Sequence, residues 1–174
     1  LQCTGDNNAH RISFGSSSSN TVTVSAFVKK DTHRYVNIGY GGLSNSFTAL
    51  FDIEPGLTSD RLLGQGIRGS STNISAGYQD FPNGWVRIWA VGTSTGSNGY
   101  SLQLAPNATA FSLNNWIADG TEAIYVWGGQ FEDDASFPTS LIHTDGSTVT
   151  RTADVTEITG NDFGTFNLFE YSEE

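Results

Sequence analysis

Apolar and polar residues alternate with a period of two along several short stretches of this chain. In residues 21–29 (TVTVSAFVK), one side of an extended backbone carries Val22, Val24, Ala26 and Val28, and the other carries Thr21, Thr23, Ser25, Phe27 and Lys29. This period is typical of a β-strand, because successive side chains of a strand point to opposite faces. We therefore expect the valine and alanine side to face a hydrophobic core.

The same alternation predicts further strands between turn-forming residues. They cover residues 11–14, 34–40, 47–53, 85–91, 100–104, 111–116 and 124–131. Pro55–Gly56 and Asn83–Gly84 mark two of the turns. Residues 57–75 are weakly patterned, and either a short edge strand or a long loop fits them. With about eight strands and no major helix, the predicted fold is an all-β jelly-roll sandwich of two antiparallel sheets.

Residues 124–131 (IYVWGGQF) differ from the other strands because bulky side chains occur on both sides. One side holds Ile124, Val126 and Gly128, and the other holds Tyr125, Trp127, Gly129 and Phe131. A strand of this kind is expected to be covered on both faces. It is therefore predicted to be the last interior strand, with Trp127 in the core and an irregular tail after it.

The length of 174 residues suits one domain with a connector. We expect a β-sandwich module over residues 1–151 and a connector over residues 152–174 that could begin a following module. The chain contains no methionine, so residue 1 is not expected to be the native start. No apolar run approaches the roughly 18 residues that a membrane-spanning helix needs, so membrane insertion is not expected.

The formal net charge of −10 is unevenly spread. Residues 132–174 contain ten acidic side chains and Arg151 as their one basic residue, whereas residues 1–131 are close to neutral. Without a basic patch, nucleic-acid binding is not expected. The acidic tail is expected to be solvated surface rather than the core of an interface, because burying so many unpaired carboxylates would be costly.

The sequence gives little support for catalysis. His10, His33 and His143 have no metal-ligand spacing, and nucleophile-elbow, phosphate-loop and zinc-protease motifs are absent. Residues 132–134 (EDD) are adjacent in sequence, which favours a solvated turn over the separated carboxylate pair of a glycosidase. We therefore expect a protein that is not an enzyme and that needs no cofactor.

Calcium is the one ion for which ligands can be found. Residues 6–8 (DNN) and residues 133–134 (DD) offer hard oxygen ligands, so a structural calcium ion is an open alternative to plain turn formation. Cys3 is the single cysteine and leaves no internal disulfide.

The clearest binding chemistry is aromatic. Trp85, Arg87 and Trp89 share one face of a predicted strand, and Tyr35 and Asn37 share the corresponding face of another. Aromatic rings stack on the C–H faces of sugars, while arginine and amide side chains hydrogen-bond to their polar edges. These five residues form the predicted glycan site. The alternative is that the tryptophans fill the second face of the sandwich or lie beneath a loop.

Four phrases resemble those of a module that recurs in bacteriophage tail-fibre and tail-spike proteins. They are TVSAFVKKDTHRYVNIGY (23–40), ALFDIEPG (49–56), NGWVRIW (83–89) and IYVWGGQFEDDASFPTSLIHTDGSTVTRTADV (124–155). The resemblance implies a carbohydrate-binding jelly roll of the galactose-binding-like or concanavalin-like kind. The tryptophan and arginine of the NGW phrase in that group fall on Trp85 and Arg87. Related glucan-binding modules often carry an acidic pair in the last strand, where this chain has Trp127 and Gly128.

The resemblance further implies a non-catalytic, lectin-like module of a phage tail fibre or similar adhesin. It would act outside the cell, on the virion, and recognise a polysaccharide or oligosaccharide of the host cell surface. Its partners would include neighbouring modules of the same fibre, with a homotrimer as one candidate assembly. Two alternatives stay open, a structural spacer in a virion fibre and an ancillary module of a polysaccharide-degrading enzyme.

The end of the chain resembles the opening strand of a following copy of the module. The resemblance lies in residues 167–174 (NLFEYSEE). The apolar residues within 158–169 are expected to pack against other parts of the protein rather than remain exposed to water. This packing could take two forms. In one, residues 166–171 add as a strand to an incomplete sheet of the sandwich. In the other version the phenylalanines dock on the sandwich and the last residues fray.

Overall fold

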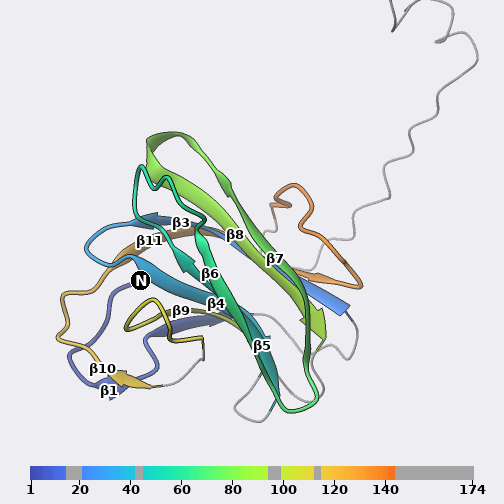
Figure 1. The fold of residues 1–174 in the computed structure, drawn as a ribbon, viewed down its shortest axis with the longest axis horizontal. Coiled ribbons are helices and arrows are strands. Elements are labelled where there is room, and N and C mark those ends of the chain that lie inside the picture. The colour runs from blue at the N-terminus through green and yellow to red at the C-terminus, as the bar shows by residue number, and fades with distance from the viewer. Residues whose placement is uncertain (15–20, 42–44, 94–98, 112–114, 144–174) are drawn as a thin grey trace, which may run out of the picture. The chain divides into compact units, whose positions relative to one another are not determined.

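Eleven β-strands form the part of the chain that this computed structural model describes, namely residues 1–14, 21–41, 45–93, 99–111 and 115–143 (Figure 1). The strands are β1 (Asn7–Asn8), β2 (Arg11–Phe14), β3 (Thr21–Lys30), β4 (Tyr35–Gly41), β5 (Ser46–Asp52), β6 (Leu62–Arg68), β7 (Thr72–Asp80), β8 (Trp85–Thr93), β9 (Tyr100–Leu104), β10 (Trp116–Ile117) and β11 (Ile124–Asp133). A 3-10 turn, η1 (Pro82–Gly84), is the one helical element in these ranges. The all-β prediction is confirmed, although the strands outnumber the eight or so expected.

Leu1–His143 forms one compact unit. The predicted boundary at residue 151, the connector over 152–174 and the added strand over 166–171 all lie outside the described residues.

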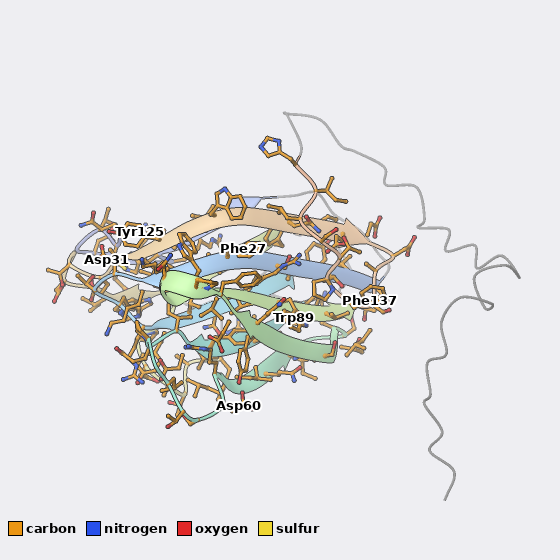
Figure 2. The ribbon with its side chains drawn as sticks, turned by 90° about the horizontal axis from the view of Figure 1, so that it is seen from above. Phe27, Asp31, Asp60, Trp89, Tyr125 and Phe137 are labelled. Atoms are coloured by element: carbon orange, nitrogen blue, oxygen red, sulfur yellow. The ribbon has the colours of Figure 1, made fainter. Side chains whose placement is uncertain are left out.

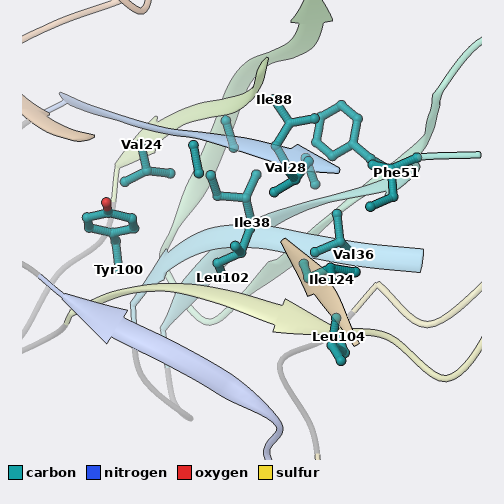
Figure 3. Close-up of a cluster of buried hydrophobic side chains, with 14 of the residues drawn as sticks. Val24, Val28, Val36, Ile38, Phe51, Ile88, Tyr100, Leu102, Leu104 and Ile124 are labelled. Atoms are coloured by element: carbon teal, nitrogen blue, oxygen red, sulfur yellow. The ribbon is translucent and has the colours of Figure 1, made fainter. Parts of the chain in front are cut away.

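The strands pair antiparallel in three sheets. β1 and β10 form a small sheet, the order β11-β3-β8-β7 a four-stranded sheet, and the order β2-β9-β4-β5-β6 a five-stranded sheet. The two larger sheets contribute to a single buried cluster (Figure 3). Val24, Val28 and Ile88 come from the four-stranded sheet, and Val36, Ile38, Phe51 and Leu102 come from the five-stranded sheet. The fold is therefore a β-sandwich whose core lies between these two sheets.

The alternation identified the inner faces of the long strands correctly. Val22, Val24, Ala26 and Val28 of β3 are fully buried, as are Val36 and Ile38 of β4. On β8, Val86, Ile88 and Ala90 are buried in the same core. Burial of these side chains from both sheets is the main hydrophobic contribution to the stability of the sandwich.

The weakly patterned stretch contains two strands rather than one edge strand or a loop. β6 completes the five-stranded sheet and β7 the four-stranded sheet, so the turn at Gly69 (φ 59°) carries the chain from one layer to the other. The pattern is weak because β6 needs glycine where Phe111 approaches it. A Cβ atom on Gly64 would lie 2.4 Å from Cε1 of Phe111.

The prediction that β11 is an interior strand was wrong, because β11 is an edge of the four-stranded sheet. Trp127 is 55% exposed rather than part of the core. A β-bulge between Trp127 and Gln130, with Gly128 at φ 58°, adds one residue to β11. The extra residue reverses the alternation, so Phe131 packs against the core instead of sharing the side of Trp127.

Ion pairs connect the two sheets at one end of the sandwich. Arg61, just before β6, bonds to Asp80 of β7 at 2.8 Å (Nε to Oδ1), and Lys30 of β3 pairs with Glu54 at 2.7 Å. Arg34, just before β4, pairs with Asp52 of β5 within the five-stranded sheet. Burial of Asp52 would raise its pKa, but hydrogen bonds from Arg34 and from the Glu54 amide outweigh burial and leave the pKa below its usual value.

Candidate functional site

The outer face of the four-stranded sheet carries the three residues that the sequence singled out on β8. Trp85, Arg87 and Trp89 alternate with the buried residues of that strand and point away from the core. Their neighbours on β3 are, in order, Lys29, Phe27 and Ser25, and across from Arg87 and Trp89 on β7 lie Gln79 and Gly77. Figure 2 looks onto this sheet, with Phe27 and Trp89 labelled.

The turn before β8 fixes where this strand begins. Asn83 (φ 62°) and Gly84 (φ 77°) both adopt positive φ, the conformation that the predicted Asn-Gly turn requires. The amide of Phe81 donates to the carbonyl of Trp85 at 2.8 Å across this turn. Phe81 is thereby held beside the first tryptophan of the strand.

Trp89 lies against the backbone of the neighbouring strand. A Cβ atom on Gly77 would be 2.6 Å from Cζ2 of the Trp89 indole, so only glycine leaves room for this ring position. Trp89 is partly exposed. The indole is therefore held by its contact with β7 and not by insertion into the core.

Arg87 lies at the centre of this face and is 8% exposed. Its Nη2 donates to Oγ of Ser25 at 3.0 Å, and its Cζ lies 5.5 Å from the centre of the Phe27 ring. Desolvation by burial lowers the pKa of the guanidinium, and the negative charge of Glu132 opposes this effect. Arginine stays charged in such surroundings because its ordinary pKa lies far above neutral pH.

Further aromatic rings extend this face. The Phe27 ring lies 5.2 Å from Phe81 and 5.1 Å from Trp127, centre to centre. Phe81 is 37% exposed and Trp127 55%. We call the outward residues of this patch the aromatic face; it comprises Phe27, Phe81, Trp85, Arg87, Trp89 and Trp127.

Sequence reasoning missed three of these six residues. Phe27 was placed on the outward side of its strand, which is correct, but it was not singled out as a site residue. Trp127 was assigned to the core because the edge position of β11 cannot be deduced from its alternation. Phe81 precedes the Asn-Gly turn, and an aromatic residue at that position is the signal that could have identified it.

Tyr35 and Asn37 do not join the aromatic face. Both lie on β4, in the five-stranded sheet, on the side that points away from Val36 and Ile38. Asn37 is fully buried, and its amide donates to the carbonyl of Ala110 at 2.7 Å in the segment that covers this side of the sheet. Alternation correctly predicted their side of the strand, but it says nothing about the sheet to which a strand belongs.

Tyr35 is partly exposed and lies beside basic and imidazole side chains. The Arg34 guanidinium carbon is 5.1 Å from the centre of its ring, and His33 lies edge-on at 6.3 Å.

A shallow hollow of about 320 Å³ lies elsewhere on the same sheet, bordered by Thr48, Arg68 and Phe111.

Trp116, the remaining tryptophan, has a structural position. Its indole N–H donates to the carbonyl of Leu104 at 3.1 Å, and its ring packs against His10 and His33. The ring therefore closes the sandwich near β9 instead of offering a free surface.

Residues 132–134 are not simply a solvated turn. Glu132 accepts hydrogen bonds from both the amide and the hydroxyl of Thr139. Gln130 donates to the carbonyl of Ser140 at 3.4 Å and accepts from the amide of Ile142 at 2.8 Å. These two side chains of β11 hold the segment after the strand against the outer side of the sheet.

The described residues contain no group of three histidine, cysteine, aspartate or glutamate side chains that could hold a metal ion. His10 contacts the carbonyl of Trp116 at 3.2 Å, and His33 that of Ala105 at 2.8 Å, so both imidazoles are engaged with backbone. Within the same ranges, no helix is long and apolar enough to cross a membrane. The aromatic face offers stacking surface from its rings and hydrogen-bond donors from Arg87.

No protein-family model matches this chain, and a search of curated proteins finds no match to it. The class that the geometry defines is an antiparallel β-sandwich with an aromatic outer face.

Proposed function

We propose that this protein is a non-catalytic glycan-binding module and that the aromatic face is its binding surface. The observation that carries the proposal is the group of outward aromatic side chains on one sheet face, with an arginine among them. Large aromatic side chains exposed together on one face are a feature of binding surfaces. Rings beside polar donors match the C–H faces and hydroxyl edges of sugars.

A sugar bound at the aromatic face would make stacking contacts with some side chains and hydrogen bonds with others. Trp89 and Trp127 are partly or largely exposed and would stack against pyranose rings. Gln79 is exposed on the neighbouring strand and would hydrogen-bond to hydroxyl groups. Because these side chains stand on strands, little conformational entropy would be lost on binding.

In its biological setting, we propose that the module belongs to a phage tail fibre or similar adhesin and recognises polysaccharide on a host cell surface. Jelly-roll topology is part of this proposal, as are neighbouring fibre modules as partners and an extracellular location on the virion. This setting is supported by the four sequence phrases that resemble tail-fibre modules, in residues 23–40, 49–56, 83–89 and 124–155. An ancillary role in a polysaccharide-degrading enzyme would use the same surface.

A structural spacer is the second candidate function. The observation that favours it is the tight packing of the face, since Arg87 is largely buried and Trp89 fits against Gly77. In a spacer these residues would stabilise the sheet or bind a neighbouring module, and no glycan would bind.

A glycan array probed with the labelled protein separates the two candidates. We expect binding that is lost or weakened by Trp127→Ala, because a largely exposed ring can be removed without opening the core. The matched control is Tyr35→Ala on the other sheet, which should bind as the wild type does. Absence of binding to every glycan, or equal loss in both variants, would contradict the proposal.

A further inference from the structure

Two buried arginines of the sandwich differ sharply in how their charges are satisfied. Arg61 is 6% exposed and Arg87 is 8% exposed. Arg61 pairs with Asp80 at 2.8 Å and donates to the carbonyls of Asp52 and Glu54 at 3.1 and 2.9 Å. Among the described residues, Arg87 makes one hydrogen bond, to Ser25, and no ion pair.

The donors of Arg87 can be followed atom by atom. Nη2 bonds to Ser25, and Nε is buried without a partner among the described residues. Nη1 makes no hydrogen bond within the described ranges either, and it is not one of the fully buried unpartnered atoms, so it reaches the surface. Burying a guanidinium whose N–H donors have no acceptor costs free energy, and a partner that accepts from those donors would remove this cost.

Glu132, the carboxylate whose negative charge acts on the Arg87 guanidinium, is already hydrogen-bonded within the described part of the chain. Glu132 lies on the same side of the sheet, and its two oxygens accept hydrogen bonds from Thr139 at the edge strand. Lys29, beside Trp85 in the register of β3 and β8, adds a second positive charge to this side. The face therefore has positive charge available at its centre, in a chain whose overall charge is −10.

We propose that the aromatic face binds an acidic glycan, with the Arg87 guanidinium paired to a carboxylate of a uronic acid or similar sugar. This inference rests on the proposed glycan-binding function and names its ligand class. A planar guanidinium matches a planar carboxylate through two parallel hydrogen bonds, which here would come from Nη1 and the second N–H of Nη2 because Nε is buried. Trp85 and Trp89 stand two residues away on either side of Arg87, about 7 Å along the strand, where they can stack on sugar rings next to the charged one.

The test compares polyuronates with matched neutral polymers. Affinity electrophoresis is run with polygalacturonate, alginate and hyaluronate, with the carboxyl-reduced form of each, and with dextran and mannan. We expect at least one of the acidic polymers to retard the protein and its carboxyl-reduced form to bind about tenfold more weakly or not at all. Raising NaCl from about 0.05 to about 0.5 M should weaken the acidic interaction.

Single-residue variants show which side chain is responsible for the preference for acidic polymers. Arg87→Gln should lose the preference for the acidic polymer, and Arg87→Lys should retain only part of it because lysine cannot pair through two parallel bonds. Arg11→Gln makes the same change of net charge at an exposed site on the five-stranded sheet and should bind as the wild type does. If Arg87→Gln does not fold, the polymer pairs and Arg87→Lys still decide.

The outcomes separate the two claims. Equal binding of acidic and carboxyl-reduced polymers, or of neutral polymers alone, would overturn the acidic ligand and leave glycan binding standing. Equal weakening by Arg11→Gln and Arg87→Gln would also overturn it, because net charge would then explain the effect. Absence of binding to all these polymers overturns the acidic ligand, and absence of binding to the whole glycan array overturns the proposed function as well.

Discussion

At the scale of single residues, the proposed binding depends on Trp89 and on Gly77, the glycine against which its ring lies. The indole occupies the space that a Cβ atom on Gly77 would need, so its position is set by the neighbouring strand. The ring is partly exposed on the side away from the core. Its role in binding can therefore be separated from its role in folding.

Trp89→Ala should weaken glycan binding by about 1–3 kcal/mol, because a stacking surface is lost. The fold should survive, since the ring does not fill the space between the sheets. Titration calorimetry with a glycan found on the array measures the first effect and a thermal melt the second. Unfolding of the variant would show that Trp89 is a core residue and that the site lies elsewhere.

Gly77→Ala tests the position of the same ring without removing it. The new methyl group would collide with the indole and displace it, so binding should weaken and the tryptophan emission spectrum should shift. Gly56→Ala is not a suitable control because Gly56 has a positive φ of 72°. Ala76→Gly, one position earlier on β7, removes a methyl group outside the aromatic face and should leave both measurements nearly unchanged. An unshifted spectrum in Gly77→Ala would contradict the described contact.

Cys3 provides an independent test at this scale. Its thiol is 4% exposed, and burial followed by the negative charges of Glu122 and Asp119 raises its pKa to about 11. Because the thiolate is the reactive form, the folded protein should react slowly with a disulfide reagent at about pH 8, and reaction should become fast in urea. Fast reaction of the native protein would contradict the burial of this residue.

At the scale of elements, β11 determines how the aromatic face is completed. It is an edge strand, and its bulge turns Phe131 inward while Trp127 stays outward. Its Gln130 and Glu132 side chains hold the segment that follows. The segment that follows β11 therefore borders the aromatic face at the edge strand.

Gln130→Ala should release that segment. The side chain is 7% exposed and bonds to Ser140 and Ile142, so its loss should lower the free energy of unfolding by about 1–2 kcal/mol. Urea denaturation measures this change, and limited proteolysis should show new cleavage between residues 134 and 143. Gln65→Ala, at an exposed position of β6, is the control; equal effects in both variants would contradict the anchoring role.

The sequence was informative about strands and less so about their arrangement. Alternation predicted the positions of β3, β4, β5, β8 and β9, and it identified the core-facing sides of β3, β4 and β8. It failed for β6, where glycines accommodate Phe111, and for β11, where a bulge reverses the sides. For the site it found Trp85, Arg87 and Trp89. It grouped Tyr35 and Asn37 with them because alternation along a strand does not show which sheet that strand joins.

At the scale of the whole molecule, the two sheets are joined by the core and by the ion pairs at one end. The pairs that cross between the sheets are Lys30 with Glu54 and Arg61 with Asp80. A third pair at this end, between Arg34 just before β4 and Asp52 of β5, lies within the five-stranded sheet. Protonation of Asp52 in acid should therefore weaken the five-stranded sheet at this end.

Asp52→Asn should lower the free energy of unfolding at neutral pH by about 1–3 kcal/mol, less than for a fully buried pair because Arg34 is partly exposed. The folded-state pKa of Asp52 lies below the ordinary 3.8. Its contribution is therefore complete above the unfolded-state pKa and is lost as the pH falls through the lower folded-state value. Urea titrations between about pH 7 and about pH 2 should show wild type and variant converging in acid.

Asp31→Asn provides the control for this experiment. Asp31 is exposed in the turn after β3, so its replacement should leave the free energy of unfolding nearly unchanged across the same pH range. A difference between wild type and Asp52→Asn that stays constant or grows in acid would contradict the ion-pair account.

The central claim, that glycan binds at the aromatic face, is tested most directly by the indole N–H signals of the four tryptophans in a 15N-correlated NMR spectrum. Titration with a glycan found on the array should shift the signals of Trp85, Trp89 and Trp127, which lie on this face. The signal of Trp116 should stay in place, because its indole is bonded to the Leu104 carbonyl beside another part of the sandwich. Movement of the Trp116 signal alone, or bound glycan without any shift on β8, would contradict the account.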